Sequence, residues 1–118
     1  MNTGKKFDPT ADRIEFNGVQ YILRIEPYQV GNAIALCLHD ETTGMREIVA
    51  TVNMPHVPLG PNQVLIKDYG ENTGMLAALE KAGVVARTGR TVKAGFVSVE
   101  VCELLPIVGL PLEEKTKK

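Results

Sequence analysis

The sequence predicts an α+β domain: a mostly antiparallel sheet of five to six strands, meander first, with one short helix packed on one face. Apolar and polar residues alternate in several short segments, as they do in half-buried strands. Residues that favour turns separate these segments. Between Val64 and Val84 the apolar spacing changes from an extended run to a helical period, which predicts a strand followed by a helix over about residues 71–82.

The length of 118 residues predicts one domain. We place this domain at 12–105, between a flexible N-terminal arm (1–11) and a flexible C-terminal tail (106–118). The first residues lack the apolar stretch of a secretory signal, and no apolar run approaches the roughly 20 residues of a membrane span. We therefore expect a cytoplasmic protein.

The first strands are predicted around Asn17 and Gly18. This pair favours a type I′ hairpin turn, because both central residues of that turn need positive φ. The flanking segments 12–17 and 19–26 carry alternating apolar residues and are predicted to be strands. Pro27 lacks an N–H to donate and is predicted to end the second strand.

Two further strands are predicted at 33–39 and 45–53, joined by a polar turn. Both faces of 33–39 are apolar, which is typical of a central strand that is covered on two sides. The short connections predict an antiparallel meander. Three prolines in 54–62 exclude regular structure there, so this segment is predicted to be a crossover loop.

A strand at 63–67 is predicted to lead into the helix. Gly70 suits the N-cap and Glu71 the first turn, where a carboxylate complements the helix dipole. Gly83 suits the left-handed residue that follows a helix. Beyond it we predict a short strand near 84–86, a turn at 87–90 and a last strand at 92–105.

Cys37 and Cys102 lie in apolar runs, which favours buried free thiols. The other interpretation is a disulfide between neighbouring strands, but two cysteines form no disulfide framework.

The candidate catalytic residues are few. His39, Asp40 and Glu41 are adjacent, yet successive side chains of a strand point to opposite faces and converge poorly on a metal. Asp68 and Glu71 are spaced for acid–base work, with His39 or His56 as further candidates, but the same spacing suits a helix start. We predict no cofactor and no metal, and we favour a protein that is not an enzyme.

The turn before the helix is the predicted protein-binding site. It contains side chains suited to recognition, and tyrosine contributes contact area at low entropic cost. The predicted contact residues are Lys67, Asp68, Tyr69, Glu71 and Asn72.

Arg87, Arg90 and Lys93 form a basic cluster that we predict either to be solvated or to contact phosphate groups. The formal net charge of −1 gives no general support to a nucleic-acid binder, since such domains usually carry a basic excess. No aromatic residue lies between these three, so a stacking platform is not indicated.

Residues 50–85 contain an Ala-Thr-Val-Asn strand, a proline-containing loop, an Ile-Lys-Asp-Tyr run, and a Gly-Met-Leu helix ending in Ala-Gly. This segment resembles a family of small uncharacterised domains from bacteriophages, plasmids and conjugative elements. Members of the family have Ser and Glu where this chain has Gly70 and Thr73, so a Ser-x-x-Glu capping box is missing here. The resemblance implies a mobile-element context and no catalytic residues.

The sequence thus leads to one preferred function and two alternatives. The preferred one is a non-catalytic interaction protein of a phage or mobile element, an accessory or anti-defence factor that binds a host or phage protein. The alternatives are a nucleic-acid-associated accessory protein and a small enzyme with an acidic site near the helix start. We expect no membrane partner, and an uncovered sheet edge would allow homo-oligomerisation.

Overall fold

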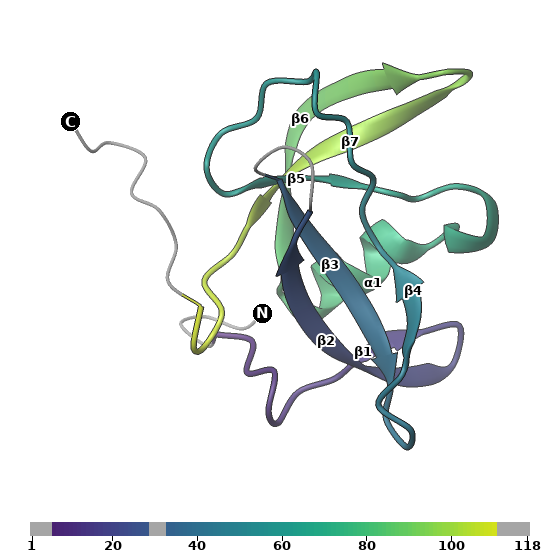
Figure 1. Cartoon of the computed structure of the whole chain (residues 1–118), viewed down its shortest axis with the longest axis vertical. Helices are drawn as coiled ribbons and strands as arrows, with labels where there is room; N and C mark the ends of the chain where they lie inside the picture. Colours follow the sequence, from purple (N-terminus) through teal and green to yellow (C-terminus); the bar gives the residue numbers. More distant parts are fainter. Residues whose placement is uncertain (1–5, 29–32, 111–118) are drawn as a thin grey trace.

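The computed structural model describes residues 6–28 and 33–110. Within these residues, seven strands form two antiparallel sheets, and one α-helix follows a short 3₁₀ turn (Figure 1). The predicted α+β class, with a meander first, is confirmed. The elements are β1 (Ile14–Phe16), β2 (Val19–Pro27), β3 (Ile34–Asp40), β4 (Arg46–Val49), β5 (Gln63–Ile66), η1 (Gly70–Asn72), α1 (Met75–Ala82), β6 (Val85–Ala94) and β7 (Val97–Leu104).

The first sheet is the predicted meander, in the order β1-β2-β3-β4. Its first hairpin turns at Asn17 and Gly18, where φ is 53° and 79°, as a type I′ turn requires. Leu36 and Leu38 of β3 face the core, while Ala35 and Cys37 are buried on the opposite face. The prediction that β3 is central and covered on both faces is therefore confirmed.

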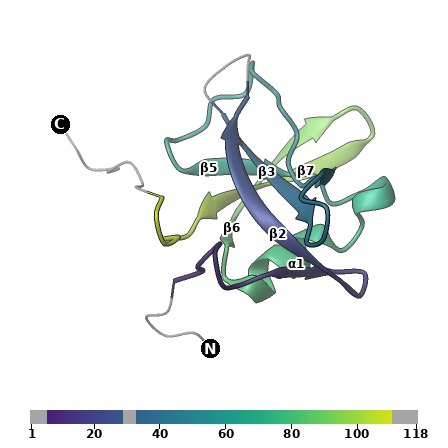
Figure 2. The ribbon, with the colours of Figure 1, turned by 60° about the horizontal axis from the view of Figure 1, so that its bottom comes forward.

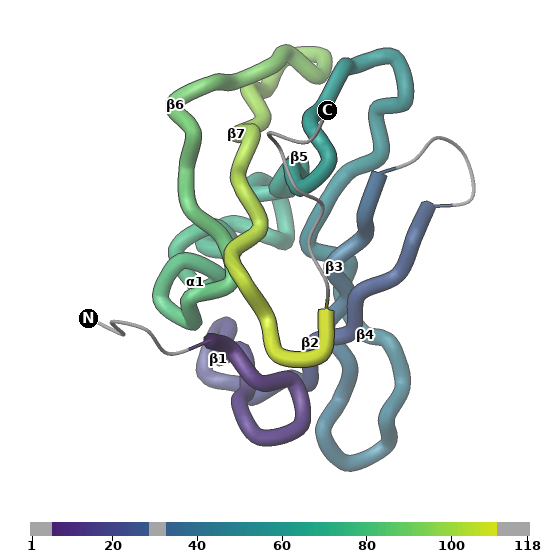
Figure 3. Tube along the Cα trace, turned by 90° about the vertical axis from the view of Figure 1, so that its left-hand side faces the viewer, coloured from purple at the N-terminus to yellow at the C-terminus, as the bar shows by residue number. Residues whose placement is uncertain are grey.

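The strands do not form the single sheet that the sequence predicts, because the chain turns a corner after β4. The Ala50 N–H donates to Leu36 of β3 over 2.8 Å, and the Ala50 carbonyl accepts from Lys67, just after β5, over 2.8 Å. A bridge between Thr51 and Ile66 continues this second pairing. The segment predicted as one strand, 45–53, thus joins two sheets that lie as separate layers in Figure 3.

The second sheet has the order β5-β7-β6, and it corrects two predictions for the C-terminal part of the chain. The segment 92–105 is not one strand, because a two-residue turn divides it between β6 and β7. The predicted turn 87–90 lies inside β6. There the register shifts between Arg87 and Arg90, so Thr88 and Gly89 form an irregularity in the strand.

Helix α1 begins later than predicted and ends where predicted. Its N-cap is Gly74 and not Gly70, which opens the 3₁₀ turn η1 instead. Gly83 follows the helix with φ 81°, in the left-handed region. Its N–H donates to Glu80, and the Val84 N–H donates to Leu79, so the helix ends in a Schellman motif.

The main core lies between the two sheets, and α1 covers the opening between β1 and β6 (Figure 2). Met75, Leu76 and Leu79 supply the buried side of the helix. A second, smaller cluster lies on the other face of the β5-β7-β6 sheet. It consists of Leu65, Val99 and Val101, and partly buried residues pack on it, namely Val52, Met54, Leu59, Tyr69, Val92, Ala94 and Val97.

The core extends beyond the predicted domain limits of 12 and 105. Phe7 and Ile107 are both buried members of the main cluster. They form a parallel bridge, and the Val108 N–H donates to the Phe7 carbonyl over 2.9 Å. Residues 1–5 of the predicted arm and residues 111–118 of the predicted tail lie outside the described residues. No helix in the described part of the chain is long and apolar enough to cross a membrane.

Both cysteines are free and buried, as predicted. Cys102 belongs to the main core and has an exposed fraction of 0%. Burial, reinforced by the negative charge of Glu100, raises the pKa of Cys102 from 9.0 to about 12. The native thiol therefore stays neutral at a pH at which an exposed thiol ionises.

This pKa predicts that alkali destabilises the protein. Above about pH 9 the unfolded state loses the Cys102 proton while the native state keeps it, so the free energy of unfolding falls as pH rises from 9.0 towards about 12. Urea unfolding at about pH 8 and about pH 10.5 measures this fall. We expect a smaller fall in Cys102→Val, and an equal fall in both proteins would contradict the assignment.

Candidate functional site

The predicted protein-binding residues occupy the turn between β5 and α1, which we call the 67–72 turn. Lys67 follows the last residue of β5, and Glu71 and Asn72 lie in η1. The structure divides the five predicted residues into two groups. Asp68 and Asn72 bond to the backbone elsewhere in the fold, Asp68 from an exposed position and Asn72 from a buried one. Lys67, Tyr69 and Glu71 leave part of their side chains accessible.

Asp68 acts as the cap of helix α1 from outside the helix. Its Oδ1 atom accepts hydrogen bonds from the backbone N–H groups of Gly74 (3.0 Å) and Leu76 (2.9 Å). These are among the N–H groups that a helix start leaves without an internal partner, and a carboxylate there also complements the helix dipole. The exposed position of Asp68 thus serves the fold, because one carboxylate oxygen fixes the path from β5 into α1.

Asn72 is anchored inside the protein. Only 2% of this residue is exposed, and its Nδ2 atom donates to the Val49 carbonyl over 2.9 Å. Val49 is the last residue of β4, next to the corner where the chain passes between the sheets. Asn72 therefore ties the turn to this corner and offers almost no surface to a partner.

Lys67 and Glu71 form an ion pair on the outside of the turn. Lys67 Nζ lies 2.8 Å from Glu71 Oε2, with 27% of the lysine side chain and 77% of the glutamate side chain exposed. The hydrogen bond from Lys67 lowers the pKa of Glu71 below its usual value, and the same bond raises the pKa of Lys67. Both groups are charged at neutral pH, so the turn presents a cation paired with an anion.

Tyr69 connects the turn to the second sheet. Its side chain is partly buried against the smaller cluster on the outer face of that sheet. Lys67 Nζ lies 5.8 Å from the centre of the Tyr69 ring, within the range of a cation–π contact. The ring is therefore held between the lysine and the sheet.

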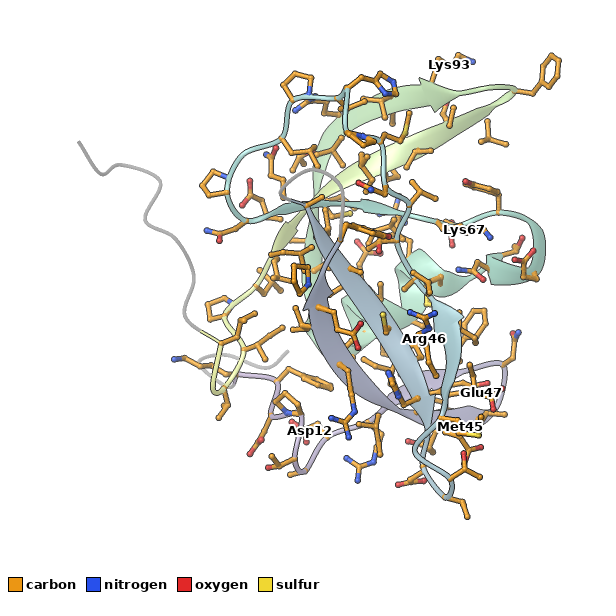
Figure 4. All side chains as sticks on the ribbon, viewed as in Figure 1. Asp12, Met45, Arg46, Glu47, Lys67 and Lys93 are labelled. Carbon is orange, nitrogen blue, oxygen red and sulfur yellow. The ribbon has the colours of Figure 1, made fainter. Side chains whose placement is uncertain are left out.

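The predicted basic cluster lies along β6, but its three members differ in what they contact. Arg87 Nε lies 3.0 Å from Glu80 Oε2 in an ion pair. Arg90 Nη2 donates to the Pro58 carbonyl over 2.9 Å. Lys93 is exposed near the end of β6, where Figure 4 shows it far from Asp12 and Met45. Two of the three candidate phosphate contacts thus already have partners within the fold.

Three of the four residues of the enzyme alternative are engaged in contacts within the fold. Asp68 and Glu71 are each engaged as described, and His39 Nδ1 is 2.9 Å from the Gly44 carbonyl in the β3–β4 turn. A hollow of about 630 Å³ lies beside the start of β3 and the 53–63 segment, and neither acidic residue lines it. Among the described residues, no three His, Cys, Asp or Glu side chains form a group able to hold a metal.

Phe96 is an exposed residue that the sequence did not single out. It occupies the turn between β6 and β7 and is fully exposed, at 105% of the reference area. Its position in an alternating apolar run led to its interpretation as a strand residue. The signal available in the sequence was Gly95, since glycine at the first central position favours a type II′ hairpin turn.

Comparisons of the chain with family models, with curated proteins and with solved structures gave no match.

Proposed function

We propose that this chain is a non-catalytic interaction protein that binds another protein through the 67–72 turn. The observation that carries the proposal is the anchoring of this turn from both ends. Asp68 fixes the start of α1, and Asn72 fixes the turn to β4. A surface that is ordered before binding loses less conformational entropy when a partner docks.

The groups that this framework displays are suited to recognition. Glu71 and Lys67 present a pair of opposite charges, and Lys67 lies over the Tyr69 ring. Charge patterns of this kind select partners and fix their orientation more than they add affinity. The partner we propose therefore carries a complementary pair of charges beside an apolar contact for the tyrosine.

The proposed biological setting rests on the sequence resemblance noted for residues 50–85 alone. We propose an accessory or anti-defence factor that acts in the bacterial cytoplasm on a host or phage protein. The nucleic-acid alternative has less support, because Arg87 is paired with Glu80 and Arg90 is bonded to Pro58. Homo-oligomerisation through a sheet edge is compatible with either function.

The test exchanges the two charges of the turn. In the double variant Lys67→Glu/Glu71→Lys the ion pair can still form, so the turn keeps its internal bond while its displayed charges are reversed. A partner is first isolated from bacterial lysate, with and without phage infection, and purified. Because juxtaposed like charges cost several kcal/mol at an interface, we expect this partner to bind the double variant at least about 10-fold more weakly.

The matched control exchanges another exposed ion pair, Arg13 with Glu41, whose Nε and Oε2 atoms are 2.9 Å apart. Arg13→Glu/Glu41→Arg should bind the partner as the wild type does. The proposal fails if lysates with and without phage yield no stoichiometric partner, or if the exchange at positions 67 and 71 leaves the affinity unchanged.

A further inference from the structure

The β6–β7 hairpin extends beyond the rest of the second sheet as a two-stranded arm. Strand β5 pairs with β7 only from Glu100 onward, so Val97–Val99 pair with β6 alone. The arm comprises residues 92–99 and projects at one end of the molecule (Figures 1 and 2). Its two-residue turn is tight: Gly95 has φ 65°, as the first central residue of a type II′ turn requires.

The type II′ turn accounts for a glycine at position 95, but it does not require an aromatic residue such as Phe96 at the next position. Polar residues such as Asn, Asp or Ser commonly follow glycine in a hairpin turn, where the side chain points into water. Phe96 instead places a complete aromatic ring in solvent, attached to a short turn between paired strands. Few internal torsions need to be fixed when such a ring enters a pocket, so it is well suited to be an anchor.

The arm carries one charged side chain, that of Lys93. Arg90 and Glu100 lie at the base of the arm, where Arg90 is opposite Val101 and Glu100 is opposite Thr91. Lys93 pairs with Ser98 and is exposed, three residues before the aromatic ring. A surface complementary to this tip combines an apolar pocket with carboxylates at its rim.

We propose that Phe96 is an anchor that inserts into an apolar pocket with an acidic rim on a folded protein partner. This inference rests on the proposed function and specifies the chemistry of the same partner. Tyr69 of the 67–72 turn and Val97 of the arm pack on one cluster, so both lie on the same outer face of the second sheet.

The arm fits a protein better than a nucleic acid. Proteins that bind single strands offer several aromatic rings along a groove of cations, because each base stacks on its own ring. The arm offers one ring and one cation, and the guanidinium of Arg90 at its base is already bonded to the Pro58 carbonyl. One aromatic residue beside a cation is instead the composition of a hot spot in a protein interface.

The test places a photo-reactive phenylalanine at the tip. Phe96 is replaced with p-benzoylphenylalanine, the full chain is produced in bacterial cells with and without phage infection, and the cells are illuminated. We expect one protein adduct, with the cross-linked peptide of the partner bordering an apolar pocket that carries Asp or Glu. The purified partner should then bind Phe96→Ser at least about 30-fold more weakly than the wild type.

Two further variants make the result specific. Lys93→Glu should weaken binding several-fold and reduce its dependence on salt, because Lys93 contributes attraction at the rim. Val19→Ser changes a 46%-exposed apolar residue of the β1–β2 hairpin and should leave the affinity unchanged. Urea unfolding of each variant shows that the fold is retained.

The inference is overturned if the adducts contain only nucleic acid, if they join two copies of this chain, if no adduct forms, or if Phe96→Ser binds the partner as tightly as the wild type. These results separate the inference from the proposed function. If the charge exchange at 67 and 71 abolishes binding but Phe96→Ser does not, the interaction function stands and the anchor is wrong. If no protein partner is found at all, both are wrong.

Discussion

Replacing Leu79 with alanine should lower the free energy of unfolding by about 2–5 kcal/mol, the range observed when a buried leucine leaves a cavity. Leu79 has an exposed fraction of 0% and lies in the main core, where α1 covers the opening between β1 and β6. Its carbonyl also accepts the Val84 N–H in the motif that ends the helix. Urea unfolding followed by circular dichroism measures the change.

Lys81→Ala is the matched control for this substitution, since Lys81 is exposed on the same helix. It should change stability by less than about 0.5 kcal/mol, as surface substitutions usually do. An eight-residue helix is too short to be stable alone, so its docking through Leu79 must hold it in place. Equal stabilities of the two variants would show that the helix does not depend on this contact.

Replacing Asn72 with alanine should cost about 1–3 kcal/mol, because it leaves the Val49 carbonyl without its side-chain donor in a water-poor site. The lost hydrogen bond is the one that joins the 67–72 turn to the end of β4, next to the corner between the two sheets. The same variant should also weaken partner binding through the 67–72 turn, although Asn72 itself is buried. Urea unfolding gives the first effect, and the affinity of the purified partner gives the second.

Glu71→Gln is the control for Asn72, because it alters the neighbouring residue at the surface. Loss of an exposed ion pair costs roughly 0–1 kcal/mol, so its effect on stability should be the smaller of the two. If Glu71→Gln destabilised the protein more than Asn72→Ala, the turn would be held by its surface charges and not by its buried amide.

Local signals in the sequence predicted the elements whose backbone geometry only certain residues allow. Asn17 and Gly18 gave the first hairpin, and Gly83 gave the end of the helix, because each adopts positive φ at little cost. The alternation of the strands gave the meander. The conformation of each of these elements is determined by a few consecutive residues, so a single sequence is enough to predict it.

The remaining features depend on contacts between distant residues. The division into two sheets follows from the pairing of Ala50 with both Leu36 and Lys67, which no local pattern records. Thr88 and Gly89 have the composition of a turn, yet they lie inside β6, where the Thr88 hydroxyl donates to the Val101 carbonyl over 2.7 Å. This tertiary bond outweighs the local preference for a turn.

The position of the turn before the helix was predicted, but the contacts that two of its residues make within the fold were not. The sequence located the turn before the helix, and residue types suggested that all five side chains serve recognition. Asp68 reaches N–H groups six and eight positions along the chain, and Asn72 reaches a carbonyl 23 positions back. Such roles need the three-dimensional path of the chain. The exposure of Phe96 likewise depends on the turn between β6 and β7, which divides a segment that the sequence predicts to be one strand.

The central claim is that the Asp68 carboxylate holds the 67–72 turn and the start of α1 in one fixed arrangement. Amide hydrogen exchange at Leu76, whose N–H is 2.9 Å from Asp68 Oδ1, tests it most directly. We predict slow exchange at this amide in the wild type and exchange at least about 10-fold faster in Asp68→Ala. The control is the Leu104 amide, which donates to the Asn62 carbonyl over 2.7 Å and should exchange at the same rate in both proteins. Exchange at Leu76 that is already as fast in the wild type as at an exposed amide would contradict the claim.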